Sequence, residues 1–386
     1  MKKNVVVLGS SGSIGKNTVK VLTQLSSRFQ TVGLAVNTSV KVMAEQAALL
    51  NCPRCVTADE RALAELKSLA PAGTHCAAGM QAMIDMVTAD DVDIVVCAIV
   101  GTGGLLSVLA ALQANKRVAL ASKEVMVMAG DLVNAKLDAG FGHIVPVDSE
   151  HSALFQCLES RRDCDVKQLI LTASGGAFRD WPQEKLASAR LMDALKHPVW
   201  DMGSKVTIDS ATLMNKALEI VEAQRLFRVA PEKIQVVIHP QSLVHSMVEF
   251  TDNAVLAQLS QPDMRFAIQY AMTYPERVDG ALPVLDWQKL MKLDFMAPDR
   301  QKYPSLDIAF AALAAGGTMP AVMNAANEEA VKAFADGIIS LPRIWDCVQN
   351  VMQKHNAQQL DSLDTAIAAD AEAGCYANEF IKINKI

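Results

Sequence analysis

The stretch that decides the fold reads Asn4-Val5-Val6-Val7-Leu8-Gly9-Ser10-Ser11-Gly12-Ser13-Ile14-Gly15, an apolar run that leads into three glycines spaced three residues apart. The run 4–8 predicts a short buried strand, and residues 14–25 predict a helix. Glycines between a strand and a helix permit a tight turn and a close backbone approach to a pyrophosphate, which the helix N-terminus then faces. An ordinary glycine turn is the alternative, but GxxGxxG in this position favours a dinucleotide site.

Strand-like and helix-like segments alternate outward from this turn. Apolar runs predict further strands at residues 31–36, 92–99, 118–121 and 143–147, with a helix at 105–114. Such alternation indicates an α/β fold, in which a parallel, doubly wound sheet carries the glycine-rich turn.

The rest of the chain changes character twice. Residues 148–273 mix strands and helices in an α+β pattern, residues 274–304 are polar and proline-bearing, and residues 305–386 are alanine-rich and helical. We therefore predict a nucleotide-binding domain (1–147), a catalytic domain (148–273), a linker (274–304) and a C-terminal helical domain (305–386). The elements predicted in the middle part are strands at 167–172, 235–238, 247–250 and 255–259, a helix at 184–195, and a strong helix at 210–227 with Asp209 or Ser210 as its N-cap.

Composition excludes several classes of protein. The 386 residues are 51% hydrophobic and 20% charged, which is a globular composition and allows two or three domains. It excludes a disordered tail, a collagen-like fibre and a small disulfide-bonded module. With 36 basic and 42 acidic residues the formal charge is −6, so the chain lacks the basic character of a general nucleic-acid binder.

The apolar stretches of the sequence predict neither a signal peptide nor a membrane-spanning helix. The apolar run near the N-terminus is too short for a signal peptide, so we expect a cytoplasmic protein. The uncharged stretches 94–112 and 308–327 reach membrane-spanning length, but glycines and a proline break them into short buried elements. The eight cysteines are then expected as reduced thiols, and Cys52-Pro-Arg-Cys55 is expected to be a chance pair in a loop rather than a zinc site.

The residues after the second predicted strand indicate which nucleotide is bound. An NAD enzyme usually places an acidic residue there to bond the ribose 2′-hydroxyl, and here the segment is Asn37-Thr38-Ser39. A carboxylate would repel a 2′-phosphate, whereas these three side chains can donate hydrogen bonds to one, and Lys41 is close in sequence. The segment favours NADP(H).

Paired carboxylates follow the predicted strand 143–147. In extended chain Asp148 and Glu150 would point the same way, at the carboxyl end of a strand, where ligands of parallel sheets bind. Two convergent carboxylates repel each other unless a cation or a proton intervenes, and hard oxygen ligands suit Mg²⁺ or Mn²⁺. The alternative is a helix N-terminus with acidic residues in its first turn.

Polar residues on the predicted helix 210–227 also have two interpretations. Asn215, Lys216, Glu219 and Glu222 lie along one side, either as a solvated face or as a third metal carboxylate with groups for an anionic substrate. Three other segments share this ambiguity. They are Ala173-Ser-Gly-Gly176, an anion-binding turn or a plain turn; 197–203, a lid or a packed loop; and Lys123-Glu124, a site pair or an exposed ion pair.

Nine segments carry a resemblance over essentially the whole chain. They are 9–15, Ala121-Ser-Lys-Glu124, Pro146-Val-Asp-Ser-Glu-His151, 172–178, His197-Pro-Val-Trp-Asp-Met-Gly203, 205–222, Ile238-His-Pro-Gln-Ser-Leu-Val-His-Ser246, Gln261-Pro-Asp-Met-Arg265 and Asn324-Ala-Ala-Asn-Glu328. Together these segments resemble the 1-deoxy-D-xylulose 5-phosphate reductoisomerase family of the non-mevalonate isoprenoid pathway. The run 209–216 is the most specific to it.

The resemblance implies a fold, a reaction and an assembly. The fold would be a Rossmann-like nucleotide domain, an α+β catalytic domain and a C-terminal helical bundle, in a homodimer. The reaction would be an NADPH-dependent rearrangement and reduction of 1-deoxy-D-xylulose 5-phosphate to 2-C-methyl-D-erythritol 4-phosphate. It would need a divalent metal, Mg²⁺ or Mn²⁺, with Co²⁺ as a further option.

The resemblance also implies roles for individual residues. Metal ligands would be Asp148, Glu150 and Glu219, and the catalytic group adds Lys123 and His197. Substrate contacts would come from Ser149, Glu150, Ser174, His197, Trp200, Met202, Ser210, Asn215, Lys216, Glu219 and His245, with Ser242 beside the last. Cofactor contacts would come from Gly9, Ser10, Ser11, Gly12, Ser13, Ile14, Gly15, Asn37, Thr38, Ser39, Ser122, Lys123, Glu124 and Gly203.

Two positions depart from the family pattern. Asn37-Thr38-Ser39 stands where a Gly-Lys-Asn or Gly-Ser-Asn segment is common, and Ser122 stands where asparagine is common. Two other functions were weighed. One alternative is another NADP-dependent dehydrogenase of a small carbonyl substrate, of the homoserine or aspartate-semialdehyde type, which does not need three carboxylates. The other is a non-catalytic nucleotide sensor, which would keep the glycines but could carry any residue in place of the three carboxylates. Metal-dependent turnover separates the three.

Overall fold

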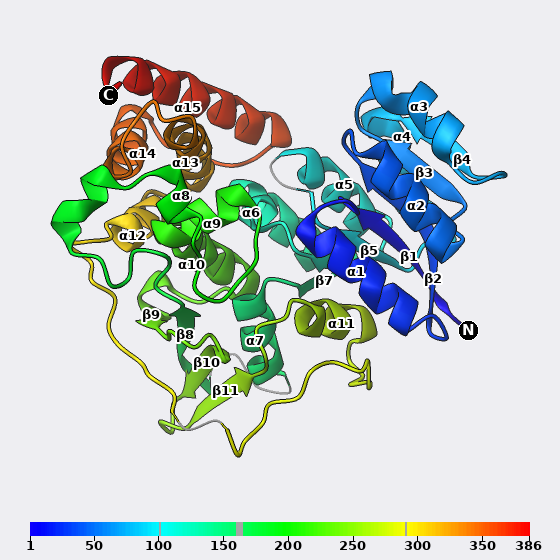
Figure 1. Cartoon of the computed structure of the whole chain (residues 1–386), viewed down its shortest axis with the longest axis horizontal. Coiled ribbons are helices and arrows are strands. Elements are labelled where there is room, and N and C mark those ends of the chain that lie inside the picture. Colours follow the sequence, from blue (N-terminus) through cyan, green and yellow to red (C-terminus); the bar gives the residue numbers. More distant parts are fainter. Residues whose placement is uncertain (100–101, 160–164, 290–291) are drawn as a thin grey trace. The chain divides into compact units, whose positions relative to one another are not determined.

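The computed structural model describes residues 1–99, 102–159, 165–289 and 292–386 (Figure 1). Contacts divide the chain into two compact units, each described by itself below. Unit 1 is Met1–Val125, Val133–Phe155 and Asp263–Val284, and unit 2 is Met126–Leu132, Gln156–Pro262 and Leu285–Ile386. The four-part division into domains stays a prediction. Cys164, expected as a reduced thiol, lies outside the described residues.

Unit 1 contains a seven-stranded sheet in the order β4-β3-β2-β1-β5-β6-β7. Every neighbouring pair of strands is parallel, so the predicted doubly wound sheet is confirmed. The strands are β1 (Lys3–Leu8), β2 (Phe29–Val36), β3 (Arg54–Thr57), β4 (His75–Ala78), β5 (Ile94–Cys97), β6 (Arg117–Leu120) and β7 (His143–Pro146).

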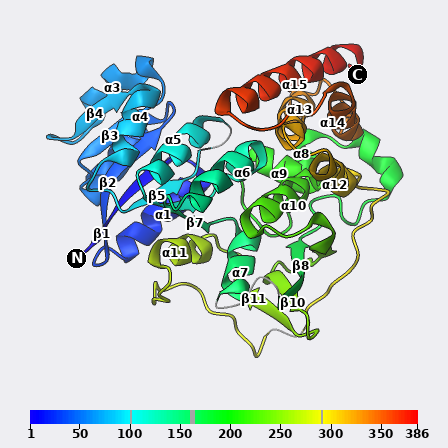
Figure 2. The ribbon, with the colours of Figure 1, turned by 180° about the vertical axis from the view of Figure 1, so that it is seen from behind.

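Helices cover both faces of this sheet. Successive side chains of β1 point to opposite faces, and Val5, Val6, Val7 and Leu8 are all buried. Val5 and Val7 share a core with Ile268 and Met272 of α11. On the other face a Cβ at Gly33 would meet Met86 of α4 at 2.6 Å, so this helix lies directly on β2. Helix α1 packs with α2 and α11, and α4 packs with α5 (Figures 1 and 2). The helices are α1 (Ser13–Gln24), α2 (Val40–Leu50), α3 (Leu63–Leu69), α4 (Gly79–Thr88), α5 (Thr102–Gln113), α6 (Lys123–Asp138), α7 (Ser149–Leu158) and α11 (Arg265–Thr273).

The CxxC pair does not lie wholly in a loop, which corrects the sequence-based expectation. Cys55 belongs to β3 and is buried between β2 and β4, and Cys52 is buried just before this strand. Strands β3 and β4 were missed because their four residues show neither alternation nor a long apolar run.

Unit 2 contains a four-stranded mixed sheet in the order β11-β10-β8-β9, in which only β8 and β9 are parallel. In the C-terminal helical region α13 packs against α12, α14 and α15. The elements are β8 (Val166–Ala173), α8 (Leu191–Ala194), α9 (Ser204–Ala211), α10 (Met214–Phe227), β9 (Ile234–Ile238), β10 (Val244–Phe250), β11 (Val255–Leu259), α12 (Ser305–Ala315), α13 (Met319–Ala335), α14 (Pro342–Lys354) and α15 (Leu363–Ile383). Across the described residues, the helices are all too short or too polar to cross a membrane.

The helix predicted at 210–227 is wrong as a single element. Its first residues complete α9, the rest form α10, and Leu213 between them adopts the left-handed conformation with φ of 57°. Thr212 is the C-cap of α9, and its hydroxyl donates back to Ile208 O at 3.0 Å. The helix predicted at 184–195 is likewise a 3-10 turn, Gln183–Ser188, and the short α8, because Ala189 and Arg190 between them are extended.

Candidate active site

The glycine-rich turn lies between β1 and α1, as the sequence predicts. Gly9 has a φ of +82°, and a Cβ there would meet Ala98 O at 2.4 Å; a Cβ at Gly15 would meet Gly9 O at 2.2 Å. Only glycine fits these two positions, and the turn keeps a bare backbone in front of α1. Gly12 is the N-cap of this helix and has no side-chain cap, so the first N–H groups face outward. This cradle fits the pyrophosphate of a dinucleotide.

The neighbouring positions of the predicted cofactor site differ in exposure. Asn37, Thr38 and Ser39 are exposed between β2 and α2, and Ser39 does not use its hydroxyl to cap α2. Ser122 and Glu124 are buried at the start of α6, where the Ser122 hydroxyl bonds to Ile99 O. The remaining residues of the turn are Ser10, which is buried, and Ser11, Ser13 and Ile14, which are at least partly exposed.

Asp148 lies between two cationic or cation-forming groups. Lys123 Nζ is 2.8 Å from its carboxylate, and His151 Nδ1 is 3.4 Å away, with His151 fully buried. Burial by itself would raise the pKa of Asp148, but the charge of Lys123 and the bond to His151 outweigh it and hold that pKa well below its usual range. Asp148 is therefore a carboxylate at neutral pH.

The extended geometry expected for Asp148 and Glu150 is wrong. Helix α7 begins at Ser149, so Glu150 lies in the first turn of a helix, and Ser149 Oγ donates to it at 2.5 Å. The alternative interpretation, acidic residues at a helix start, describes the local structure. The two interpretations do not exclude each other, because a helix start also brings carboxylates together at the end of β7.

Two further carboxylates, Glu219 and Glu222, lie on α10 and are fully buried. Lys216 forms an ion pair with Glu219, and the Asn215 amide donates to the same carboxylate. Because Lys216 is itself 3% exposed, this side of α10 is not a solvated face. Burial of a charged Glu–Lys pair costs free energy, which points to a functional reason for it.

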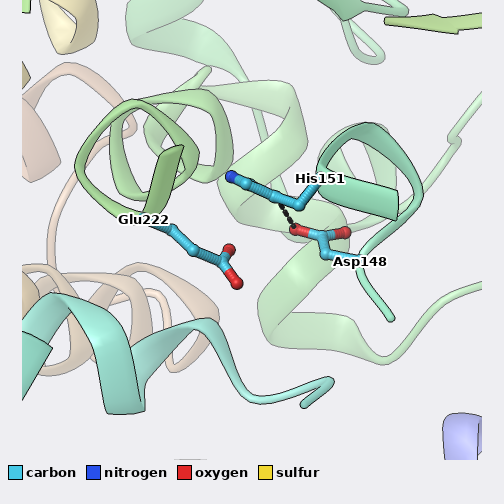
Figure 3. A group of neighbouring side chains, drawn as sticks. All are labelled: Asp148, His151 and Glu222. Carbon is cyan, nitrogen blue, oxygen red and sulfur yellow. Dashed lines mark ion pairs between the residues drawn. The ribbon is translucent and has the colours of Figure 1, made fainter. Parts of the chain in front are cut away.

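These side chains form two groups with the composition of a metal site. The candidate ligand sets are Asp148 with Glu150 and Glu219, and Asp148 with His151 and Glu222. Figure 3 shows the ion pair of His151 with Asp148. The predicted metal ligands did not include His151 or Glu222, although Glu222 was among the polar residues named on the predicted helix 210–227. Their spacing was the available signal, since each follows a predicted ligand by three residues on a helix.

A second cluster surrounds Ser174, which follows β8. His197 Nδ1 accepts the backbone N–H groups of Val199 and Trp200 at 3.2 and 2.8 Å. In the neutral ring the proton therefore sits on Nε2, which lies 3.0 Å from Ser174 Oγ and donates to it. The N–H of Gly176 donates to the same oxygen at 3.1 Å. A cluster of hydroxyl, imidazole and backbone donors suits an anionic ligand.

Several further predicted substrate residues lie in unit 2, as this cluster does. Ser210 is buried near the end of α9, and a Cβ at Gly176 would meet its carbonyl oxygen at 2.4 Å. Trp200 is half-buried with its ring 6.1 Å from that of His245, whose Nε2 is 2.9 Å from Ser260 Oγ. Met202 is half-buried, Gly203 is exposed at the N-cap of α9, and Ser242 is buried with a φ of 51°.

Three family models match the chain. They describe 1-deoxy-D-xylulose 5-phosphate reductoisomerase at residues 5–130, its C-terminal domain at 144–227, and a DXP reductoisomerase C-terminal domain at 259–375. The enzyme of that name from Pelotomaculum thermopropionicum is 48% identical over 95% of this chain and 96% of its own. That from Pelodictyon phaeoclathratiforme is 45% identical over 98% and 100%.

Solved structures of similar proteins agree. The Zymomonas mobilis reductoisomerase in complex with NADPH superposes with a TM-score of 0.93 at 38% identity, covering 99% of this chain and 100% of that one. A DOX-P reductoisomerase in complex with NADPH, fosmidomycin and magnesium has a TM-score of 0.92 at 36% identity, covering 99% and 98%.

Proposed function

The chain belongs to the 1-deoxy-D-xylulose 5-phosphate reductoisomerase family, and from that premise we propose how its residues divide the work of the reaction. It is an NADP-dependent oxidoreductase that converts 1-deoxy-D-xylulose 5-phosphate to 2-C-methyl-D-erythritol 4-phosphate with NADPH and a divalent metal. The observation that carries this function is the pair of largely buried, lysine-paired carboxylates Asp148 and Glu219, which a simple dehydrogenase does not need.

We propose Asp148, Glu150 and Glu219 as the ligands of Mg²⁺ or Mn²⁺, with Co²⁺ as a further option. Three carboxylates are a hard oxygen donor set, which suits these divalent ions. A bound divalent ion polarises a substrate carbonyl and stabilises the negative charge that develops on oxygen. The protein supplies ionised ligands, because the partners of Asp148 lower its pKa.

Lys123 and Ser149 are proposed to orient the reacting part of the substrate. Lys123 already binds one oxygen of Asp148, so its ammonium can donate to a substrate oxygen next to that carboxylate. Ser149 Oγ donates a hydrogen bond to the Glu150 carboxylate, and we propose that it holds a substrate hydroxyl.

The substrate phosphate is proposed to bind the cluster around Ser174. Its donors would be Ser174, His197, Ser210, Asn215 and Lys216, of which only the last carries a fixed positive charge. Trp200 and Met202 are proposed to close over the substrate and exclude water, with His245 behind them.

NADPH is proposed to lie on the turn 9–15, with its 2′-phosphate near Asn37, Thr38 and Ser39. The cofactor supplies hydride to the substrate when bound. The exposed amide and hydroxyl groups of these three residues can donate hydrogen bonds to a phosphate, and they include no carboxylate to repel it. Ser122, Lys123, Glu124 and Gly203 complete the proposed contacts.

The test is oxidation of NADPH, followed at 340 nm, with and without the sugar phosphate, the metal and a chelator. Oxidation that needs both the sugar phosphate and the metal is expected. Glu219→Gln keeps the shape of the side chain but removes the charged ligand, so we expect turnover to fall by at least about 10²-fold. Glu232→Gln, an exposed position on a 3-10 turn, is the matched control and should retain activity. A fully active Glu219→Gln enzyme would refute the metal assignment.

We also propose a homodimer in the cytoplasm. Strand β11 is an edge strand of its sheet, and Val255 and Leu256 on it are 49% and 37% exposed, which favours a covering partner. Light scattering after gel filtration should give twice the chain mass, and Leu256→Lys should shift it towards the monomer. The buried free thiols of Cys55 and Cys97 fit a reducing compartment, which cell fractionation tests.

A further inference from the structure

Lys302 is a buried lysine whose ammonium group is held by carbonyl oxygens. The residue is 6% exposed, and Nζ donates to Phe178 O at 2.6 Å, Trp181 O at 2.6 Å and Arg179 O at 3.0 Å. These bonds use all three protons of the ammonium group. Burying a cation is costly unless its protons find acceptors, so the lysine and the three carbonyls fix one another.

The backbone of Lys302 is itself held in place. Asp299 Oδ1 accepts the N–H groups of Gln301 and Lys302, both at 3.0 Å, and Asp299 O accepts the N–H of Tyr303 at 3.0 Å. The Tyr303 ring lies 5.0 Å from the ammonium group. The lysine therefore reaches the three carbonyls from a fixed turn and not from a loose surface segment.

The carbonyls belong to a turn, residues 178–181, that is tied to Ser174. Because the peptide group is planar and trans, turning Phe178 O towards Lys302 turns the N–H of Arg179 the opposite way. That N–H donates to Gly176 O at 3.4 Å, and Arg179 Nη1 donates to Ser174 O at 3.2 Å. The orientation set by Lys302 is thus passed along hydrogen bonds to Ser174.

The Ser174 side of these bonds is the proposed phosphate site. Ser174 Oγ accepts hydrogen bonds from His197 Nε2 and from the N–H of Gly176, and Gly176 lies against Ser210. Binding a phosphate through several neutral donors depends on their orientation, because each N–H or O–H weakens steeply when it points off the acceptor.

We propose that Lys302 is a positioning residue for the substrate phosphate: by fixing the turn 178–181 it holds Ser174 and Gly176 in the orientation that binds the anion. The proposal rests on the proposed function, since it deepens the role of the Ser174 cluster. Lys302 itself bonds only the turn and is not proposed to touch the substrate.

The test compares steady-state kinetics of Lys302→Met with those of the wild-type enzyme. Methionine has a similar length and no donors, so the turn loses its anchor. We expect the KM for 1-deoxy-D-xylulose 5-phosphate to rise about tenfold, with kcat and the Kd of NADPH within about twofold, the pattern of lost ground-state binding. Lys289→Met is the matched control, because this lysine also lies in the segment 274–304 and its side chain is 86% exposed. It should leave the KM unchanged.

Other outcomes separate the possibilities. Wild-type protein without turnover overturns the proposed function and this inference with it, whereas an active wild type with an unchanged KM in Lys302→Met overturns only the role of Lys302. A parallel loss of kcat and NADPH affinity would make Lys302 a general structural residue. Lys302→Gln keeps two N–H donors and should give a smaller rise in KM. Should neither variant fold, Lys302 belongs to the core of the fold and the proposal fails.

Discussion

Lys123 and Asp148 show how a single ion pair prepares a proposed metal ligand. Both side chains are largely buried, and the ammonium group keeps the carboxylate ionised where burial alone would favour its neutral form. Lys216 and Glu219 on α10 form a second buried ion pair. Before any metal binds, each of these carboxylates has an internal cation.

This pairing predicts a pH dependence of stability. The folded-state pKa of Asp148 lies below its unfolded value of about 3.9, so its contribution to stability is present above about pH 4 and is lost as pH falls. Lys123→Met should raise this pKa and flatten the dependence by up to about 1.4 kcal/mol per pH unit, the value for one proton.

Urea unfolding of the apo-protein between pH 3 and pH 7 measures this slope. The matched control is Lys185→Met, which removes an exposed lysine of the 3-10 turn Gln183–Ser188. Equal slopes in wild type and Lys123→Met would show that Lys123 does not set the ionisation of Asp148.

At the scale of elements, the turn between β1 and α1 separates glycines that the backbone requires from one that it tolerates. A Cβ at Gly15 would lie 2.2 Å from Gly9 O, whereas a Cβ at Gly12 would lie 3.5 Å from the same atom, an ordinary contact. The GxxGxxG pattern treats the three glycines alike. Gly15 cannot carry a Cβ and Gly12 can, because the first turn of α1 brings Gly15 directly against the carbonyl oxygen of Gly9.

Gly15→Ala should therefore destabilise the apo-protein by about 1–3 kcal/mol, the usual cost of overpacking, and weaken NADPH binding. Gly12→Ala should leave the apo-protein as stable as the wild type. Thermal unfolding without cofactor and fluorescence titration with NADPH measure the two effects. A Gly15→Ala protein with unchanged stability would contradict the close approach of α1 to this carbonyl.

The break between α9 and α10 is a second case in which an element decides the site. Leu213 has a φ of 57°, which interrupts a sequence with continuous helical character. The break starts a new helix just before Asn215 and Lys216, so these two side chains and Glu219 share the first turns of α10. A continuous helix would change their direction relative to Ser210.

For the whole molecule, the internal ion pairs predict that the metal serves the reaction and not the folding of the chain. A chelator should abolish turnover but shift the melting temperature by less than about 3 °C, because Asp148 and Glu219 keep Lys123 and Lys216 as partners. NADPH at 100 times its Kd should add about 2.7 kcal/mol to stability. Thermal scans with EDTA, Mg²⁺ and NADPH check both values. Unfolding on chelation would assign the ion a structural role.

The sequence by itself determined the parallel sheet, the glycine turn and the family, and it predicted the carboxylates of the proposed metal site. These features depend on local patterns, because an apolar run, a glycine spacing or a motif is read within a few residues. The strands β3 and β4 were not predicted, because each has only four residues and shows neither alternation nor a long apolar run.

Only the tertiary structure decided what these residues contact. It placed Glu150 in a helix start and not in extended chain, buried the Lys216–Glu219 pair, added His151 beside Asp148, and brought Lys302 to the carbonyls of residues 178–181. Lys302 lies more than a hundred residues beyond that turn in sequence. Burial and hydrogen bonding between segments so far apart depend on how the whole unit packs, which no local pattern contains.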